Sequence, residues 1–140
     1  TALYGQKPWG SAGPPVRSGW RLVTRVVAVH ERAGGSAVGY GSEFRLRDRG
    51  RIAVLAIGTA DGFETAPVGP FYRANPLRAF LKGRRRKVSV EIGGRSFPVV
   101  GRVSMQLTTV LVDESVRVGD EATVPALRLM VGPHVPRVAV

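Results

Sequence analysis

Short segments in which apolar and polar residues alternate, separated by glycine-rich turns, recur along most of this chain. The clearest case is Gly93-Gly94, which separates the segments 87–92 and 95–100. Two adjacent residues that both accept positive φ, placed between such segments, are typical of a tight β-hairpin. Pro98 has no backbone N–H, so we expect the second arm to lie at a sheet edge or a bulge. This pattern predicts an antiparallel β-protein.

The same pattern predicts an all-β fold of about eight strands, an antiparallel β-barrel or a sandwich. In the first strand, alternation puts Val26 on one face and Val27 and Val29 on the other. The tripeptide Asp48-Arg49-Gly50 predicts a turn, so the arginines on either side of it are expected to flank a hairpin. The expected strands cover 20–30, 38–47, 52–57, 87–92, 95–100, 102–112, 122–131 and 135–140.

The length of 140 residues, 44% of them hydrophobic, suits one domain with a buried core. Residues 1–19 are rich in glycine, proline and serine and predict an irregular N-terminal arm, which leaves 20–140 as a single β-barrel domain. One short inserted helix is expected near 75–82. Asn75 suits its N-cap, Pro76 its first position and Gly83 its end.

The formal net charge of +11 suggests a polyanionic partner such as nucleic acid. The densest basic cluster, Arg84, Arg85, Arg86 and Lys87, provides candidate anion contacts. A solvated loop is the simpler explanation of this cluster, so nucleic acid is the less favoured partner. The chain has no cysteine, which excludes disulfides but gives no information on redox compartment. It has no apolar run as long as a membrane span and no visible signal peptide, and these two features predict a cytoplasmic protein without membrane contact.

Tyr40 is the strongest candidate for chemistry, because it stands between Gly39 and Gly41. The two glycines give its phenol little cover and permit unusual backbone angles. The phenol could act as a base only if nearby positive charge lowered its pKa from about 10. A barrel tyrosine with a satisfied hydroxyl is the alternative. His30 and His134 stand in no metal-ligand spacing, so no metal site is expected.

Three motifs occur in order along the chain: VGYGS at 38–42, IGTADGF at 57–63 and PVVGRVSM at 98–105. VGDE at 118–121 and GPHVPRV at 132–138 follow them. Together they resemble the C-terminal domain of alanine racemase, an enzyme that uses pyridoxal phosphate (PLP). The resemblance covers nearly the whole chain and implies a mostly β domain, which agrees with the strand count.

The resemblance also implies roles for single residues. Tyr40 matches a catalytic acid/base that reaches across a dimer interface into the PLP site of the partner. Met105 matches a residue whose backbone helps to bind the substrate carboxylate, and Phe44, Thr59 and Gln106 are the further substrate-binding candidates. In the family the PLP lysine lies in an N-terminal barrel that this sequence does not contain, so no cofactor is expected in this chain.

Departures from the family pattern shape the functional hypotheses. Thr59 and Pro125 stand where the family has tyrosines, and Gln106 where it usually has an aspartate. These changes favour a repurposed domain that binds a small molecule near Tyr40 and catalyses a cofactor-independent isomerisation or cyclisation. The alternatives are an accessory subunit that supplies Tyr40 in trans to a separate PLP-binding racemase barrel, and a basic nucleic-acid-binding module.

Two further expectations accompany these hypotheses. Racemase activity of this chain by itself is not expected, because its lysines stand only in loop-like or basic contexts. A homodimer is expected, because a domain without its barrel would expose apolar β surface that another protein surface must cover.

Overall fold

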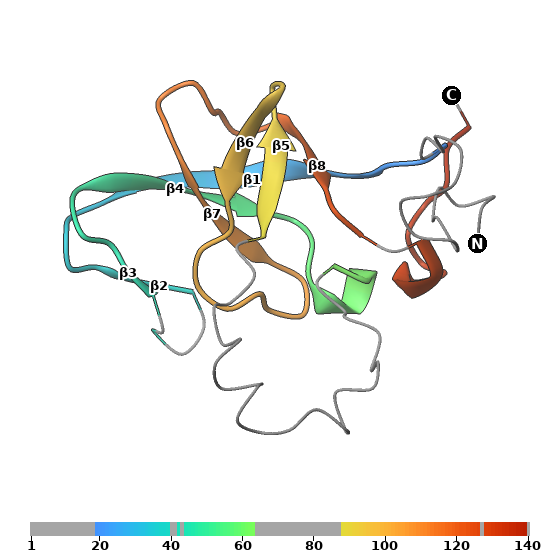
Figure 1. Ribbon diagram of the computed structural model, residues 1–140, viewed down its shortest axis with the longest axis horizontal. Coiled ribbons are helices and arrows are strands. Elements are labelled where there is room, and N and C mark those ends of the chain that lie inside the picture. Colours follow the sequence, from blue (N-terminus) through green and yellow to red (C-terminus); the bar gives the residue numbers. More distant parts are fainter. Residues whose placement is uncertain (1–18, 40–41, 43, 64–87, 127, 140) are drawn as a thin grey trace, which may run out of the picture.

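The computed structural model describes residues 19–39, 42, 44–63, 88–126 and 128–139. These residues form eight strands and two short 3-10 helices (Figure 1). The strands are β1 (Leu22–Arg32), β2 (Ala37–Val38), β3 (Phe44–Arg45), β4 (Gly50–Leu55), β5 (Ser89–Ile92), β6 (Arg95–Pro98), β7 (Thr108–Val112) and β8 (Glu121–Val124). The 3-10 helices are η2 (Thr59–Asp61) and η4 (Arg128–Met130).

Six strands form one antiparallel sheet in the order β6-β5-β8-β1-β4-β7. β1 belongs to both parts of the sheet, because its first residues pair with β8 and its later residues with β4. In Figure 1 the β5–β6 hairpin stands across β1, and an isolated bridge between Val99 and Val110 brings the two ends of the sheet together. The sheet is therefore a curled half-barrel, which confirms the predicted all-β antiparallel fold.

The core lies inside this curl. Leu55, Phe63 and Val110 are completely buried there. A second, smaller cluster contains Val38 and Ile52, where the β2–β3 ribbon meets the sheet. Burial of large aliphatic and aromatic side chains stabilises the fold by about 1.5–3 kcal/mol for each one, so the larger cluster dominates the stability of the domain.

β1 confirms the predicted alternation only up to a bulge. Val26 is buried and Val27 is exposed, as a half-buried strand requires. The pairing with β4 then shifts register between Val26 and Ala28. Since an extra residue in one strand reverses the faces that follow it, Val29 packs against the core and not on the outer face that the alternation predicted.

The β5–β6 hairpin confirms the turn prediction. Gly93 and Gly94 have φ values of 57° and 75°, and both signs are those of a two-residue hairpin turn. Pro98 lies on β6 and pairs with Ser89 on β5. β6 is an end strand of the sheet. The edge position predicted for this proline is therefore confirmed.

Three of the expected strands, all after residue 100, differ from the structure. The segment 102–112 is a strand only at Thr108–Val112, because residues 101–107 form a loop. β8 ends at Val124, just before Pro125, and not at 131. The expected strand at 135–140 is wrong for the described residues 135–139, which carry no strand. Pro136 lacks a backbone donor within this segment, so it could not complete a ladder there.

The prediction for the second strand was also wrong in part. The segment 38–47 contains two short strands, β2 and β3, which pair with each other. β4 pairs with β1 and β7. The turn before β4 therefore joins strands of different sheets, and its arginines do not flank a hairpin.

The predicted helix near 75–82 and residues 1–18 of the predicted N-terminal arm lie outside the described residues. Within the described ranges, none of the helices has the length and apolar character needed to cross a membrane.

Candidate functional site

Two of the motif segments meet through their backbones. The Thr59 amide donates to the Ser104 carbonyl at 3.0 Å, and the Ala60 amide donates to the Met105 carbonyl at 2.9 Å. At Gly58 the approach is so close that a side chain would overlap the backbone of Ser104 and Met105. A glycine is therefore required for this contact, which fixes η2 against a loop 45 residues further along the chain.

Residues 104–107, called the Met105 loop from here on, form a turn closed by the Ser104 side chain. Ser104 Oγ accepts a hydrogen bond from the Leu107 amide at 3.0 Å and donates to the Leu107 carbonyl at 2.9 Å. Met105 is nevertheless 70% exposed and Leu107 48% exposed. Gln106 between them is also exposed. The loop thus combines a fixed backbone with apolar side chains in solvent.

The side chain of Asp61 caps η2 and contacts the C-terminal segment. Its Oδ2 accepts a hydrogen bond from the Gly58 amide at 2.9 Å, in the manner of a capping residue. Its Oδ1 lies 3.0 Å from Nε2 of His134 in the C-terminal segment. Gly62, with φ 94°, packs so tightly on Met130 that a side chain would overlap the Met130 carbonyl. η2 therefore contacts the Met105 loop through Thr59 and Ala60, and the C-terminal segment through Asp61.

The structure brings together three of the predicted site residues, Thr59, Met105 and Gln106. Phe44 is placed elsewhere, half-buried on β3 against the smaller core cluster. Tyr40 lies outside the described residues, as do Arg84, Arg85, Arg86 and Lys87. The catalytic role of Tyr40 and the anion contacts of the basic cluster stay predictions.

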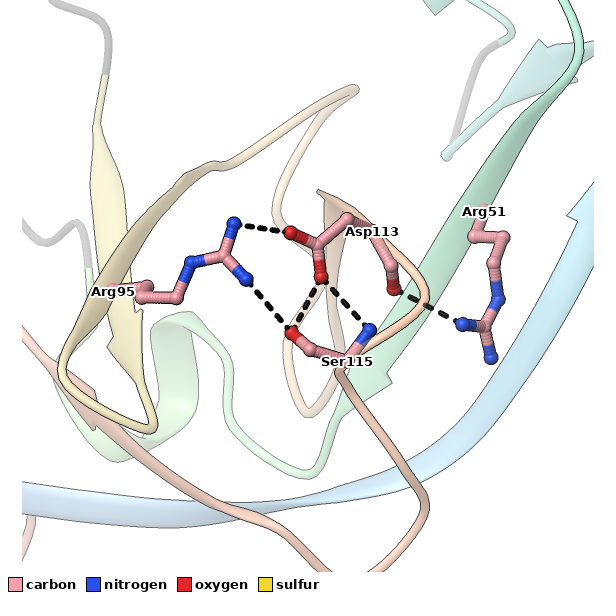
Figure 2. Close-up of polar contacts among 4 residues, drawn as sticks. All are labelled: Arg51, Arg95, Asp113 and Ser115. Carbon is pink, nitrogen blue, oxygen red and sulfur yellow. Dashed lines mark hydrogen bonds and ion pairs between the residues drawn. The ribbon is translucent and has the colours of Figure 1, made fainter.

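A second polar cluster ties the β5–β6 hairpin to the loop after β7. Figure 2 shows Arg95 contacting the Asp113 carboxylate and, at 3.1 Å, the Ser115 hydroxyl. Asp113 Oδ1 accepts from the Ser115 hydroxyl at 2.5 Å and from its amide at 2.9 Å, while the Asp113 carbonyl accepts from Arg51 at 3.1 Å. These hydrogen bonds from Ser115, with the charge of Arg95, lower the pKa of Asp113. The cluster holds two strand connections together.

Two open hollows occur among the described residues, and neither is lined by Thr59, Met105 or Gln106. One of about 460 Å³ is bordered by charged groups, including Glu31 and Asp113. Arg49 binds Glu31 there and lowers its pKa. The other, of about 290 Å³, lies beside β5 and β8. Neither of these two hollows supports a small-molecule pocket at the Met105 loop.

Comparison with known proteins decides the family. The family described as "Alanine racemase, C-terminal domain" matches residues 20–132. The chain belongs to this family. The biosynthetic alanine racemase of Agrobacterium fabrum is 32% identical over 139 residues, which are 96% of this chain and 32% of that protein. The alanine racemase of Chlorobaculum tepidum is 36% identical over 124 residues, 86% of this chain and 28% of its own length.

Solved alanine racemases share the fold. The biosynthetic alanine racemase from Pseudomonas aeruginosa superimposes with a TM-score of 0.68 at 28% identity, over 90% of this chain and 32% of that one. The alanine racemase from Bartonella henselae with covalently bound pyridoxal phosphate gives 0.65 at 27% identity, over 96% of this chain and 32% of its own. This chain thus spans about a third of the length of the curated alanine racemases it matches.

Proteins bind PLP covalently through a lysine amine. The three lysines of the chain, Lys7, Lys82 and Lys87, all lie outside the described residues.

Sequence reasoning missed the pairing of Asp61 with His134. Asp61 stands inside a quoted motif, three residues after Gly58, and this spacing is a capping signal. His134 gave no such signal, because 73 residues separate it from its partner.

Proposed function

We propose that this chain is the β-domain part of an alanine-racemase-type catalytic unit and that it acts together with a PLP-binding barrel. The barrel would belong to another polypeptide or to a longer form of this one. The observation that supports this most is the Met105 loop, whose backbone is fixed by η2 while Met105 stays 70% exposed. A fixed apolar surface of this kind is typical of one that a partner covers.

In this proposal the chain contributes substrate-side groups and the barrel contributes the cofactor. The Met105 loop would orient the substrate through its backbone, as the family resemblance implies for Met105. Tyr40 would hold or move a proton at its phenol oxygen. Two copies of the unit would assemble as a homodimer, in which Tyr40 of one copy serves the site of the other.

A chimera tests the proposal directly. This chain replaces the matched third of the Agrobacterium fabrum alanine racemase, and interconversion of L- and D-alanine is measured. We expect racemisation by the chimera and none by the chain alone. Tyr40→Phe in the chimera should lower kcat by about 10²–10⁴-fold, the usual contribution of a positioned acid or base. Phe44→Leu is a packing control, because the structure places Phe44 against the smaller core cluster and not with Thr59 and Met105.

The chimera must first be shown to fold and to carry PLP, by circular dichroism and by cofactor absorbance. A folded, PLP-loaded chimera that does not racemise alanine contradicts the proposal. Sedimentation of the active chimera gives its oligomeric state, and an active monomer contradicts the dimer part alone.

A second candidate is a cofactor-independent isomerase or cyclase that binds a small molecule near Tyr40. One observation favours it: Thr59 and Gln106 replace groups that the resemblance places at a racemase substrate entrance. This candidate predicts that the free chain binds small apolar molecules in a fragment screen and that Tyr40→Phe weakens the binding. An active chimera together with a free chain that binds no fragment would exclude it.

A further inference from the structure

The C-terminal segment carries no strand over 131–139, yet it contacts η2. Just before this segment and just after η2, Ala126 forms a bridge with Phe63 and Met130 packs on Gly62. The last polar link in this contact joins His134 to Asp61. The His134 side chain is 57% exposed, whereas that of Asp61 is only 23% exposed. Asp61 is thus the more fixed member of the pair.

The two oxygens of the Asp61 carboxylate have different partners. One accepts from the Gly58 amide at the start of η2, and the other faces His134. The next two amides of η2, those of Thr59 and Ala60, donate to the carbonyls of Ser104 and Met105. Two sets of hydrogen bonds, joined by the backbone of Gly58–Ala60, therefore connect the imidazole with the backbone of the Met105 loop.

We propose that His134 is a positioning residue that sets the placement of the Met105 loop through Asp61. A change in the His134–Asp61 contact alters the tilt of η2, because the same carboxylate caps the first amide of that turn. The tilt of η2 then moves the Met105 carbonyl, which accepts from Ala60 at 2.9 Å. The importance of this coupling for substrate binding rests on the proposed function, whereas the coupling itself does not.

The protonation state of His134 makes the coupling measurable. A doubly protonated imidazole forms a charge-assisted hydrogen bond with a carboxylate, which is shorter and stronger than the neutral one. Imidazoles change charge between about pH 5 and 8. The elements in contact with η2 also carry Arg128 on η4 and Arg137 in the C-terminal segment, so the variants below isolate the contribution of His134.

The chain contains only two methionines, Met105 and Met130, and their backbones meet different residues, Ala60 and Gly62. Selective ¹³C labelling of the methionine methyl groups therefore gives a two-peak NMR spectrum, assigned with Met130→Leu. We expect the Met105 methyl shift to follow pH from 5 to 8, with the same midpoint as the His134 ring proton. His134→Gln keeps an N–H donor of similar reach but does not titrate, so it should abolish the pH dependence and leave the Met105 peak near its wild-type position.

Further variants complete the test. His134→Ala removes the donor and should displace the Met105 peak at every pH, and the Gln variant should restore it. His30→Gln is the matched control, because His30 is the only other histidine of the chain and lies exposed on β1; it should leave the Met105 titration intact. If His134→Ala does not fold, the comparison of wild type with His134→Gln remains decisive.

A Met105 methyl shift that does not change while the His134 ring titrates overturns the inference, as does a titration that persists in His134→Gln. Neither result depends on racemisation. An inactive chimera with an intact His134–Met105 coupling contradicts the proposed function alone. An active chimera without the coupling contradicts the positioning role alone.

Discussion

Gly58 lies where η2 and the Met105 loop touch, and its lack of a side chain permits the contact. We predict that Gly58→Ala destabilises the fold by about 1–3 kcal/mol, the usual cost of overpacking, because the added methyl group would meet backbone atoms that cannot rotate away. Urea unfolding measures the loss. Gly19→Ala is the control, since none of the described residues lies within 4 Å of its added Cβ, and it should change stability by less than about 0.5 kcal/mol. Equal effects of the two variants would contradict the packing argument.

Asp113 gives the stability of the domain a defined pH dependence. Hydrogen bonds from Ser115, with the charge of Arg95, put its pKa below the ordinary value of about 3.9. A carboxylate with a lowered folded-state pKa stabilises the fold above about pH 4, and this contribution is lost as the pH falls through the lowered folded-state value. We therefore predict that Asp113→Asn lowers the melting temperature at pH 7 but has little effect near pH 2.

Thermal melts of wild type and Asp113→Asn between pH 2 and 7 measure this difference. Glu114→Gln is the matched control, because it removes a neighbouring exposed carboxylate and should not reproduce the pH-dependent loss. Melting curves of wild type and Asp113→Asn that stay parallel at all pH values would show that the Ser115 and Arg95 contacts do not stabilise the ionised form.

At the scale of the element, the Gly93-Gly94 pair in the sequence determines the turn of the β5–β6 hairpin. Both glycines have positive φ, and among the described residues neither has a neighbour within 4 Å of an added Cβ. Backbone strain alone should therefore decide which substitutions are tolerated. We predict that Gly94→Val costs about 1–2 kcal/mol, whereas Gly93→Asn is nearly neutral, because Asn-Gly is a favoured hairpin turn. Urea denaturation measures both. A large loss in Gly93→Asn would contradict this interpretation of the turn.

The sequence predicted this hairpin well because its signal is local: two glycines and one proline decide it. The strand expected at 135–140 failed for a non-local reason. Val135 packs against the core while Val138 is 82% exposed, so apolar residues there reflect docking of a loop and not a paired strand. Likewise, the bulge at Val26–Ala28 depends on where β1 exchanges β8 for β4, and alternation within β1 cannot show it.

The motif resemblance selected Thr59, Met105 and Gln106, and the structure places Thr59 of η2 against the loop that carries the other two. Their role in substrate binding stays a prediction. Phe44, selected in the same way, belongs to the smaller core cluster. The Asp61–His134 contact could not be predicted, because a pairing across 73 residues depends on the path of the whole C-terminal segment.

At the scale of the molecule, the exposure of the Met105 loop tests whether this domain works alone or is covered by a PLP-binding barrel. Met105 is 70% exposed, whereas Met130 is half-buried beside Gly62. Oxidation of methionine to its sulfoxide follows exposure, so dilute peroxide should oxidise Met105 several-fold faster than Met130 in the free chain. Peptide mass spectrometry over time gives both rates, and Met105→Leu identifies the faster peptide.

In the PLP-loaded chimera, the same measurement reports whether a barrel covers the loop. We predict that the Met105 rate falls to that of Met130 or below, while the Met130 rate changes little, because Met130 is already half-buried beside Gly62. The Met130 rate also serves as an internal control for folding, since partial unfolding would raise it. A folded chimera in which Met105 oxidises as fast as in the free chain would mean that the barrel leaves this loop in solvent, and the Met105 loop could then not contribute to a shared active site.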